Sequence, residues 1–265
     1  MTDWLDLCRA AVADVDGVLE RLPTRVEREP VVGAGLGGDE TTAIDQAAEE
    51  VILARVREAA GAVVSEEIGR IGEGLPLVVV DPIDGSLNAK RRLRPYSLSI
   101  AVASGETMRD VAFGYVADLS SRDEWWAALG RGACFRDEPL AVPADPELEI
   151  LGVESARPEL VAAAGDALTA TGARRLRMIG SIALSLCHVA AGRFDGLVSL
   201  RPCRSVDAAA GQLLVREAGG EVAFPDTADG ELGASLTLAM RSRVVAAPSA
   251  AVMRQLGALA SPVPG

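Results

Sequence analysis

The chain has 265 residues, 49% of them hydrophobic and 24% charged, which is ordinary for a soluble globular protein with a sizeable core. Its formal net charge of -12 argues against a nucleic-acid backbone or an anionic membrane as partner, although metal ions can still let an acidic protein bind a phosphorylated metabolite. The four cysteines form no C-x-x-C pair, no apolar run is long enough to span a bilayer, and the N-terminus lacks a signal pattern, so we expect a cytoplasmic protein.

Two helices are predicted near the N-terminus, separated by a glycine-rich segment. Apolar residues at helical spacing predict the first helix over 3–21. The glycines of 31–39 superficially suggest a dinucleotide-binding fingerprint, but their spacing is wrong and no βαβ unit encloses them, so a mobile loop is predicted here. Thr42 is predicted to cap the second helix, over about 43–59, with Asp45 in its first turn.

Two buried strands are predicted next, and each ends on acidic residues. The strands at 63–64 and 77–80 run into the sequences Ser-Glu-Glu and Asp-Pro-Ile-Asp-Gly-Ser. Pro82 is predicted to end the second strand, so Asp81 and Asp84 emerge together beside a turn. Burying two carboxylates there is very costly unless a cation holds them, and hard oxygen ligands suit Mg²⁺. The alternative is a plain strand-to-turn connection with solvated acids.

The rest of the chain is predicted to form an antiparallel meander and then an α/β half. The meander has expected strands at 97–102, 111–117 and 124–128, with shorter ones at 134–135 and 140–142. In the second half, strands are expected at 149–153, 176–178, 196–200, 221–224 and 243–247. They alternate with helices over about 158–171, 182–191, 206–218 and 249–259.

Five acids stand at predicted strand ends or in first helical turns, where their side chains can converge on one cavity: Asp45, Glu66, Asp81, Asp84 and Asp207. Such a set can hold two or three divalent ions, polarise a phosphate ester and lower the pKa of a bound water. The only histidine, His188, lies in an apolar predicted helix, where a structural role is commoner than ligation.

Four motifs occur in order along nearly the whole chain. They are D-x-x-T-x-x-D at 39–45, the acid pair within 65–67, D-P-I-D-G-S-L-N at 81–88, and V-D-A-A-A-G at 206–211 followed by E-A-G-G at 217–220. In this order they resemble the inositol-monophosphatase superfamily of Mg²⁺-dependent, lithium-sensitive phosphatases. The resemblance implies an α/β fold, a layered α-β-α-β-α sandwich. An N-terminal α+β half (1–145) and a C-terminal α/β half (146–265) would enclose the active site between them.

The resemblance also implies roles for individual residues. The metal ligands would be Glu66, Asp81, the Ile83 carbonyl, Asp84 and Asp207. Asp45 would act at a further metal or water position, and the catalytic set would be Asp45, Glu66 and Ser86, with Ser86 and Asp45 orienting the attacking water. Asp84 and the backbone amides of Gly85 and Ser86 would face the phosphate, and Gly180 and Ser181 would open a helix lining the substrate pocket.

Some positions depart from the better-known members of that superfamily. Ser86 stands where Thr is usual, which retains the hydroxyl, and Leu200 replaces a Glu that binds a ring hydroxyl in inositol-selective members. The pattern more closely resembles that of the archaeal-type branch of the superfamily. This resemblance implies a dual activity as inositol monophosphatase and fructose-1,6-bisphosphatase. Arg177, Arg201 and Arg204 are candidates for binding a second phosphate or sugar hydroxyls; the alternative is that they are plain surface charges.

We therefore expect a Mg²⁺-dependent phosphomonoesterase acting on inositol monophosphate, fructose 1,6-bisphosphate or both, and inhibited by Li⁺. Alternatives are a phosphatase for 3′-phosphoadenosine phosphates, NADP or histidinol phosphate, or a non-catalytic relative that binds metal or metabolite. An oxidoreductase is suggested only by the glycine-rich segment. A homodimer is expected from the resemblance. Trp125 and Trp126 could lie at its interface, or one could pack in the core while the other covers a sheet edge.

Overall fold

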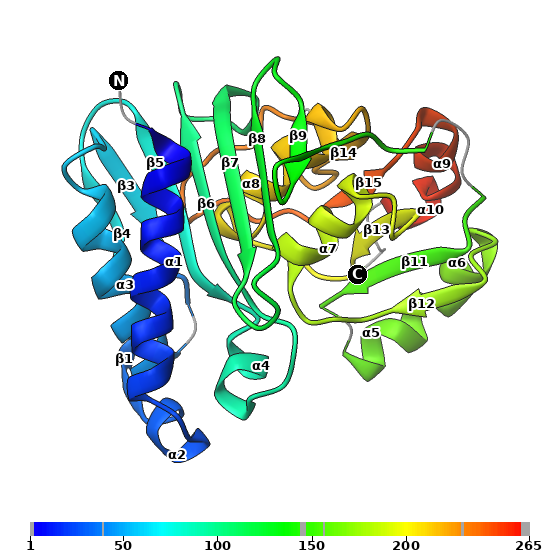
Figure 1. The fold of residues 1–265 in the computed structure, drawn as a ribbon. Coiled ribbons are helices and arrows are strands. Elements are labelled where there is room, and N and C mark those ends of the chain that lie inside the picture. The colour runs from blue at the N-terminus through cyan, green and yellow to red at the C-terminus, as the bar shows by residue number, and fades with distance from the viewer. Residues whose placement is uncertain (1–2, 39, 144–146, 156, 229–230, 261–265) are drawn as a thin grey trace.

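The helices and strands of the protein stack in alternating layers, α-β-α-β-α (Figure 1). The structure, a computed structural model, describes residues 3–38, 40–143, 147–155, 157–228 and 231–260. The expected boundary between the two halves, at 145, falls outside these ranges, so that division stays a prediction. Among the described residues, no helix combines the length and the apolar character that crossing a bilayer requires.

The first layer consists of α1 (Trp4–Arg21) and α3 (Ala43–Val56), which pack side by side against the larger sheet (Figure 1). The short α2 (Arg25–Arg28) follows α1. Both helices were predicted from apolar residues at helical spacing, and both predictions are confirmed. Val15 and Ile52 on their apolar faces are buried in one cluster with Val78 of the sheet. The first turn of α3 therefore begins at a fixed place on the edge of that sheet.

The larger sheet has the strand order β10-β9-β8-β7-β6-β5-β3-β4. The bounds are β3 (Ala62–Ser65), β4 (Gly69–Gly72), β5 (Leu77–Asp84), β6 (Ser97–Ala103), β7 (Val111–Asp118), β8 (Glu124–Ala128), β9 (Ala133–Phe135) and β10 (Glu138–Leu140). A 3₁₀ turn, Met108–Asp110, precedes β7. The antiparallel meander is confirmed, whereas β4 was not predicted and β10 begins two residues before its predicted start.

Two predictions near the site were wrong. The segment predicted as a mobile loop contains β1 (Val31–Ala34), which pairs antiparallel with β2 (Glu40–Thr42). The central strand β5 does not stop at Pro82 but continues through Asp84, which pairs with Ser97. An irregularity in the register between Asp81 and Asp84 accommodates the proline, because a residue without an N–H group falls where the ladder is already interrupted. The turn after β5 forms α4 (Ser86–Arg91), which was also not predicted.

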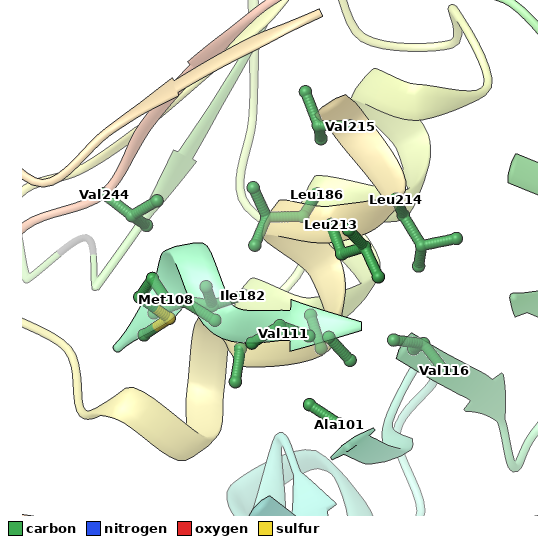
Figure 2. Packing of buried hydrophobic residues seen from close by; sticks show 14 of the residues in the cluster. Ala101, Met108, Val111, Val116, Ile182, Leu186, Leu213, Leu214, Val215 and Val244 are labelled. Carbon is green, nitrogen blue, oxygen red and sulfur yellow. The ribbon is translucent and has the colours of Figure 1, made fainter. Parts of the chain in front are cut away.

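The middle layer consists of α7 (Ile182–Ala190) and α8 (Ser205–Glu217), packed between the two sheets. Leu186 of α7 and Leu213 and Leu214 of α8 meet Val111 and Val116 of β7 in one buried cluster (Figure 2). Because nearly every residue of both helices is buried, their N-termini are held rigidly at the same end of the larger sheet.

The smaller sheet and the outer helices complete the layers. Its strand order is β12-β11-β13-β15-β14, with β11 (Ile150–Glu154), β12 (Arg175–Arg177), β13 (Gly196–Ser199), β14 (Glu221–Ala223) and β15 (Val245–Ala247). The outer helices are α5 (Pro158–Ala163), α6 (Gly165–Ala170), α9 (Ala250–Gln255) and α10 (Gly257–Ala260). The two predicted outer helices are each divided in two at a glycine, a residue that weakens helix interiors.

Candidate active site

A cavity of about 410 Å³ opens where β3 and β5 end beside the first turn of α3. Its lining includes four of the five predicted acids, Asp45, Glu66, Asp81 and Asp84, together with Ile83, Gly85 and Ser86. The fifth acid, Asp207, lines an adjoining cavity of about 370 Å³, and Arg204 belongs to both linings. The structure therefore brings the predicted acids to one region from elements far apart in the sequence.

The parallel pairing of β3 with β5 explains why Glu66 and Asp81 emerge together. Ser65 is in register with Val80, so the next residue along each chain is an acid. The turn that carries Glu66 is held by Glu49 of α3, whose Oε1 accepts hydrogen bonds from the backbone N–H groups of Glu67 (3.2 Å) and Ile68 (3.3 Å) and from the Ser65 hydroxyl. Glu49 is buried and was not among the predicted site residues.

Asp45 stands in the first turn of α3 and lines the cavity. Its Oδ2 accepts hydrogen bonds from the backbone N–H (3.3 Å) and the hydroxyl (2.5 Å) of Thr42. Its Oδ1 is buried and accepts no hydrogen bond from any described residue. Lys90, the only lysine of the chain, lies 3.8 Å from Asp45 Oδ2 and also lines the cavity, a residue that the sequence did not single out.

Asp84 joins the larger sheet to the helix α7. Its Oδ2 accepts hydrogen bonds from Ser181 Oγ (2.6 Å) and from the Ala183 backbone N–H (2.7 Å). Three residues earlier, Asp81 Oδ1 accepts a hydrogen bond from the Ile83 backbone N–H (3.1 Å). Both carboxylates are thus oriented by the protein, while their remaining oxygens are available to a ligand.

Gly85 and Gly180 let two turns approach each other beside Asp84. Gly85 has φ +90°, and a Cβ atom on it would lie 3.0 Å from the Gly180 carbonyl oxygen, so a side chain there would be strained. Ser86 follows in α4 and donates a hydrogen bond to the Ile83 carbonyl oxygen (3.0 Å). Asn88 holds the second turn by donating from Nδ2 to the Ile179 carbonyl oxygen (2.8 Å).

Glu154, at the end of β11, fixes the turn that precedes α7. Its Oε1 accepts hydrogen bonds from the Ile179 N–H (3.1 Å) and Ser185 Oγ (2.7 Å), and its Oε2 accepts one from the Gly180 N–H (3.0 Å). Glu154 was not among the predicted site residues. The only available signal was an acid at the end of a predicted strand, the same signal that identified the other acids.

Burial raises the pKa values of the central carboxyl groups. Burial first and then repulsion from Asp207 raise the pKa of Asp84 to about 7. The pKa of Glu66 is raised to about 8, mainly by burial, although the Arg204 guanidinium opposes that rise. Burial and the neighbouring acids Glu66 and Asp84 raise the pKa of Asp81 well above its ordinary value. When all three carboxyl groups are ionised, they need a positive charge near them.

The donor set fits a hard divalent cation, because its oxygens are buried carboxylates and Asp45 Oδ1 has no partner. Within the described ranges, however, no three acidic, histidine or cysteine side chains converge closely enough to form a ready-made ligand set. The Arg204 guanidinium lies between two of the acids, with Nη1 2.5 Å from Glu66 Oε1 and Nε 3.2 Å from Asp207 Oδ1. The positive charge between these two carboxylates is thus that of the Arg204 side chain.

The predicted arginines are placed differently from one another. Arg201 lines the adjoining cavity with Arg157, Arg204 and Arg241. Arg177 lies in β12, outside the linings of both cavities, and its Nη1 donates to the neighbouring Leu176 carbonyl oxygen (2.9 Å). The structure therefore groups Arg201 and Arg204 near the acids but does not bring Arg177 to them.

His188 and the tryptophan pair lie away from the acids. His188 is in α7, where it packs edge-on against Trp125 with ring centroids 5.9 Å apart, and burial lowers its pKa to about 4. Trp125 is 1% exposed, whereas the half-buried Trp126 donates from Nε1 to Asp137 Oδ1 (3.0 Å). Trp125 is thus a core residue, as the second of the two interpretations of this pair expected.

Comparison with known proteins places the chain among phosphatases. The model of the inositol monophosphatase family matches residues 5–261. A fructose-1,6-bisphosphatase/inositol-1-monophosphatase from Archaeoglobus fulgidus is 34% identical over 223 residues, covering 83% of this chain and 84% of that protein. A bifunctional NADP phosphatase/NAD kinase from Methanococcus maripaludis is 28% identical over 243 residues, covering 83% of this chain and 43% of that protein.

Solved structures confirm the layered α-β-α-β-α fold. The crystal structure of the MJ0109 gene product, an inositol monophosphatase-fructose 1,6 bisphosphatase, superposes with a TM-score of 0.86 and covers 97% of this chain and 100% of that one. At 23% identity, that likeness concerns the fold alone. The family match over almost the entire chain carries the assignment: the chain belongs to the inositol monophosphatase family of metal-dependent phosphatases, hydrolases of phosphoric monoesters.

Proposed function

We propose that this phosphatase hydrolyses inositol monophosphate, fructose 1,6-bisphosphate or both, with Mg²⁺ as its cofactor. The observation that carries the proposal is the cavity lined by Asp45, Glu66, Asp81 and Asp84, whose central carboxyl groups are buried and have raised pKa values. Buried acids in this number are stable as carboxylates only beside cations, and Mg²⁺ prefers carboxylate and carbonyl oxygens.

The proposed ligands for two or three Mg²⁺ ions are Glu66, Asp81, the Ile83 carbonyl oxygen, Asp84 and Asp207. Bound Mg²⁺ would supply a lowered pKa for the attacking water and neutralisation of charge on the phosphate ester. The protein contributes a fixed arrangement, since Ser181 and the Ala183 N–H orient Asp84, and Glu49 holds the turn of Glu66.

The attacking water is proposed to lie between Asp45 and Ser86, which line the same cavity. The oxygen Asp45 Oδ1 accepts no hydrogen bond from the described residues, so it can accept one from the water and take its proton. Glu66 is the second proposed proton acceptor. The backbone N–H groups of Gly85 and Ser86 are proposed to bind phosphate oxygens, and Gly180 and Ser181 to border the substrate.

The adjoining cavity supports a substrate with a second anionic group. Arg157, Arg201 and Arg241 line it together with Arg204, and guanidinium groups suit phosphate oxygens. The test is kcat/KM for inositol 1-phosphate against fructose 1,6-bisphosphate, with Mg²⁺ supplied. Arg201→Ala is expected to lower kcat/KM for the bisphosphate about tenfold and to leave the monophosphate nearly unchanged. Equal losses on both substrates would contradict a role for Arg201 in binding a second phosphate.

NADP is the second candidate substrate, because the Methanococcus maripaludis relative is named as an NADP phosphatase. Release of inorganic phosphate from NADP, 3′-phosphoadenosine phosphates and histidinol phosphate, measured beside the two main candidates, separates these activities. The substrate with the highest kcat/KM identifies the activity. A preference for NADP over both sugar phosphates would replace the main proposal.

Three further properties are proposed, the first two from the family resemblance. Li⁺ is expected to inhibit phosphate release, and a LiCl titration tests this. A homodimer is expected to appear in light scattering, although the buried Trp125 gives no support for an interface at the tryptophan pair. A cytoplasmic location is supported by four cysteines that form no disulfide.

A further inference from the structure

Arg204 occupies a position between two acids that the proposed function assigns to metal ions. Its Nη1 lies 2.5 Å from Glu66 Oε1, and its Nε lies 3.2 Å from Asp207 Oδ1. The three side chains are largely buried, with 17%, 10% and 9% of their surfaces exposed for Arg204, Glu66 and Asp207. The guanidinium therefore connects the larger sheet to the N-terminus of α8.

Local structure fixes this position. Arg204 is the residue that precedes α8, and its backbone N–H donates to Asp207 Oδ2 (2.8 Å), so main chain and side chain both hold the same carboxylate. On the opposite side, Gly37 leaves the space that the guanidinium needs, because a Cβ atom there would lie 3.0 Å from Arg204 Nη1. The planar guanidinium reaches the two acids through different nitrogens, which a lysine ammonium cannot reproduce.

A divalent cation and this guanidinium would compete for the same oxygens. Glu66 and Asp207 are both proposed ligands, yet each gives an oxygen to Arg204. The guanidinium stands between the two acids, and among the described residues no three acidic, histidine or cysteine side chains converge on one point. A metal ion that takes Glu66 Oε1 and Asp207 Oδ1 as ligands requires the guanidinium to leave.

We propose that Arg204 is a built-in counter-ion of the metal-free enzyme, and that binding of a divalent cation by Glu66 and Asp207 displaces its guanidinium. This inference rests on the proposed function, since it assumes that these two acids are metal ligands. Arg204 stabilises the ionised acid cluster and in doing so lowers its affinity for cations. Arg204 also lines the adjoining cavity with Arg157, Arg201 and Arg241. The displaced guanidinium therefore stays beside the place proposed for a second anionic group of the substrate.

The first test measures cation affinity without any turnover. Mg²⁺ binding to the metal-free protein is followed by calorimetry for the wild type, Arg204→Gln, Arg204→Lys and Arg201→Gln. Arg204→Gln is expected to bind Mg²⁺ about tenfold more tightly because the competitor is gone, and Arg204→Lys should lie between it and the wild type. Arg201→Gln removes the same charge from the neighbouring cavity without a contact to either acid and should change the affinity far less.

The variants separate displacement from a general charge effect. If Arg204→Lys binds Mg²⁺ like the wild type, or if Arg201→Gln gains as much as Arg204→Gln, charge alone is responsible and the proposal is overturned. Unchanged or weaker binding by Arg204→Gln also overturns it. If the wild type binds no Mg²⁺ at all, the proposed metal site is wrong instead, so the two failures are distinguishable.

A second test observes the guanidinium itself and uses the wild-type protein, so it does not depend on a variant folding. Phenylglyoxal modifies accessible arginines, and mass spectrometry of the digested protein measures the rate at Arg204. Mg²⁺ is expected to increase that rate several-fold and to leave Arg216, on the other end of α8, unchanged. An Arg204 rate that Mg²⁺ leaves unchanged or lowers would refute displacement.

Discussion

At the residue scale, two buried glutamates each hold a turn of the proposed site: Glu49 holds the turn of the proposed ligand Glu66, and Glu154 holds the turn of Gly180 and Ser181. Glu49 accepts hydrogen bonds from two successive backbone N–H groups and the Ser65 hydroxyl beside Glu66. Glu154 accepts from two successive N–H groups and the Ser185 hydroxyl beside Ser181. A carboxylate that accepts three hydrogen bonds fixes a turn more firmly than a neutral acceptor would. These glutamates therefore determine where the neighbouring acids point.

Glu154→Gln should weaken catalysis without removing a ligand. The glutamine amide would place an N–H group against a backbone N–H donor, so the turn of Gly180 and Ser181 would shift away from Asp84. We expect kcat to fall about tenfold to 100-fold, as for other residues that support metal ligands. Glu147→Gln, on an exposed pair with Arg174, is the matched control.

The readout for Glu154→Gln is kcat and the Mg²⁺ concentration at half-maximal rate, measured with Tm. A positioning role raises the Mg²⁺ requirement as well as lowering kcat. If Tm falls but both kinetic quantities stay at the wild-type values, Glu154 has only a structural role.

The structure brings together four acids that the sequence singled out, Asp45, Glu66, Asp81 and Asp84, while their roles stay predictions. Acids at strand ends could be predicted because Asp81 and Asp84 follow a run of valines, and Asp45 follows a capping threonine. The sequence did not predict the supporting contacts of Glu49 and Glu154, or the pairing of Arg204 with Glu66 and Asp207. Their partners are backbone groups or acids from other elements, and only the folded chain brings them together.

At the scale of elements, the β1–β2 hairpin is the part that sequence reasoning misjudged most. Its tip is held against the turn after β3 by hydrogen bonds from the Leu36 and Gly37 N–H groups to the carbonyl oxygens of Glu67 and Glu66, both 2.9 Å. Short strands with glycines give a weak sequence signal, and the partners lie 29 and 31 residues away by residue number. The hairpin therefore covers one side of the acid cavity.

Gly37→Ala tests this contact. A Cβ atom at Gly37 would lie 3.0 Å from the Glu66 carbonyl oxygen and 3.0 Å from Arg204 Nη1, so the hairpin tip must move. We expect a loss of about 1–3 kcal/mol in the free energy of unfolding and several-fold lower kcat/KM. Gly33→Ala in the same hairpin, with no atom within 4 Å of the added Cβ, is the control. Equal behaviour of the two variants would show that the close approach is unimportant.

The longer elements were predictable from periodicity, and their ends were not. The helices α1, α3, α7 and α8 and the strands β5 to β8 follow apolar patterns that the cores then bury. The continuation of β5 past Pro82 depends on pairing with β6, and α4 begins directly after Gly85, which has a positive φ and lies close to Gly180. Such tertiary contacts override local turn signals.

At the scale of the whole molecule, three buried clusters hold the layers together and leave the acids at one end. One lies between α1, α3 and the larger sheet, one between the sheets around α7 and α8, and one under the outer helices. The layered architecture could be predicted from the order of the motifs through the family resemblance. The burial of the acids, with its effect on stability, follows only from the structure.

The stability of the metal-free protein should depend on pH in a defined direction. The pKa values of Asp84 (about 7) and Glu66 (about 8) are above those of unfolded chains, so the folded state holds more protons there and the free energy of unfolding falls as the pH rises from about 6.5 to 8. His188 acts in the opposite direction, but only between its folded pKa of about 4 and its ordinary pKa of 6.5, below this window. Urea unfolding across this window measures the slope.

Saturating Mg²⁺ should flatten that slope, because carboxylates that bind a cation are already ionised. The comparison is made by repeating the urea series with and without Mg²⁺ at each pH. A stability that rises with pH in the metal-free protein, or a slope that Mg²⁺ leaves unchanged, would contradict the account of the acid cluster.

The most direct test of the central claim, that the acid cavity is the Mg²⁺ site of a phosphatase, is Asp84→Asn. We measure kcat/KM for the best phosphate ester together with calorimetric Mg²⁺ binding, and use the exposed Asp166→Asn as control. Asparagine keeps the shape of the side chain but removes its charge, so we expect kcat/KM to fall about 100-fold or more and Mg²⁺ binding to weaken. Full Mg²⁺-dependent activity in Asp84→Asn would contradict the account.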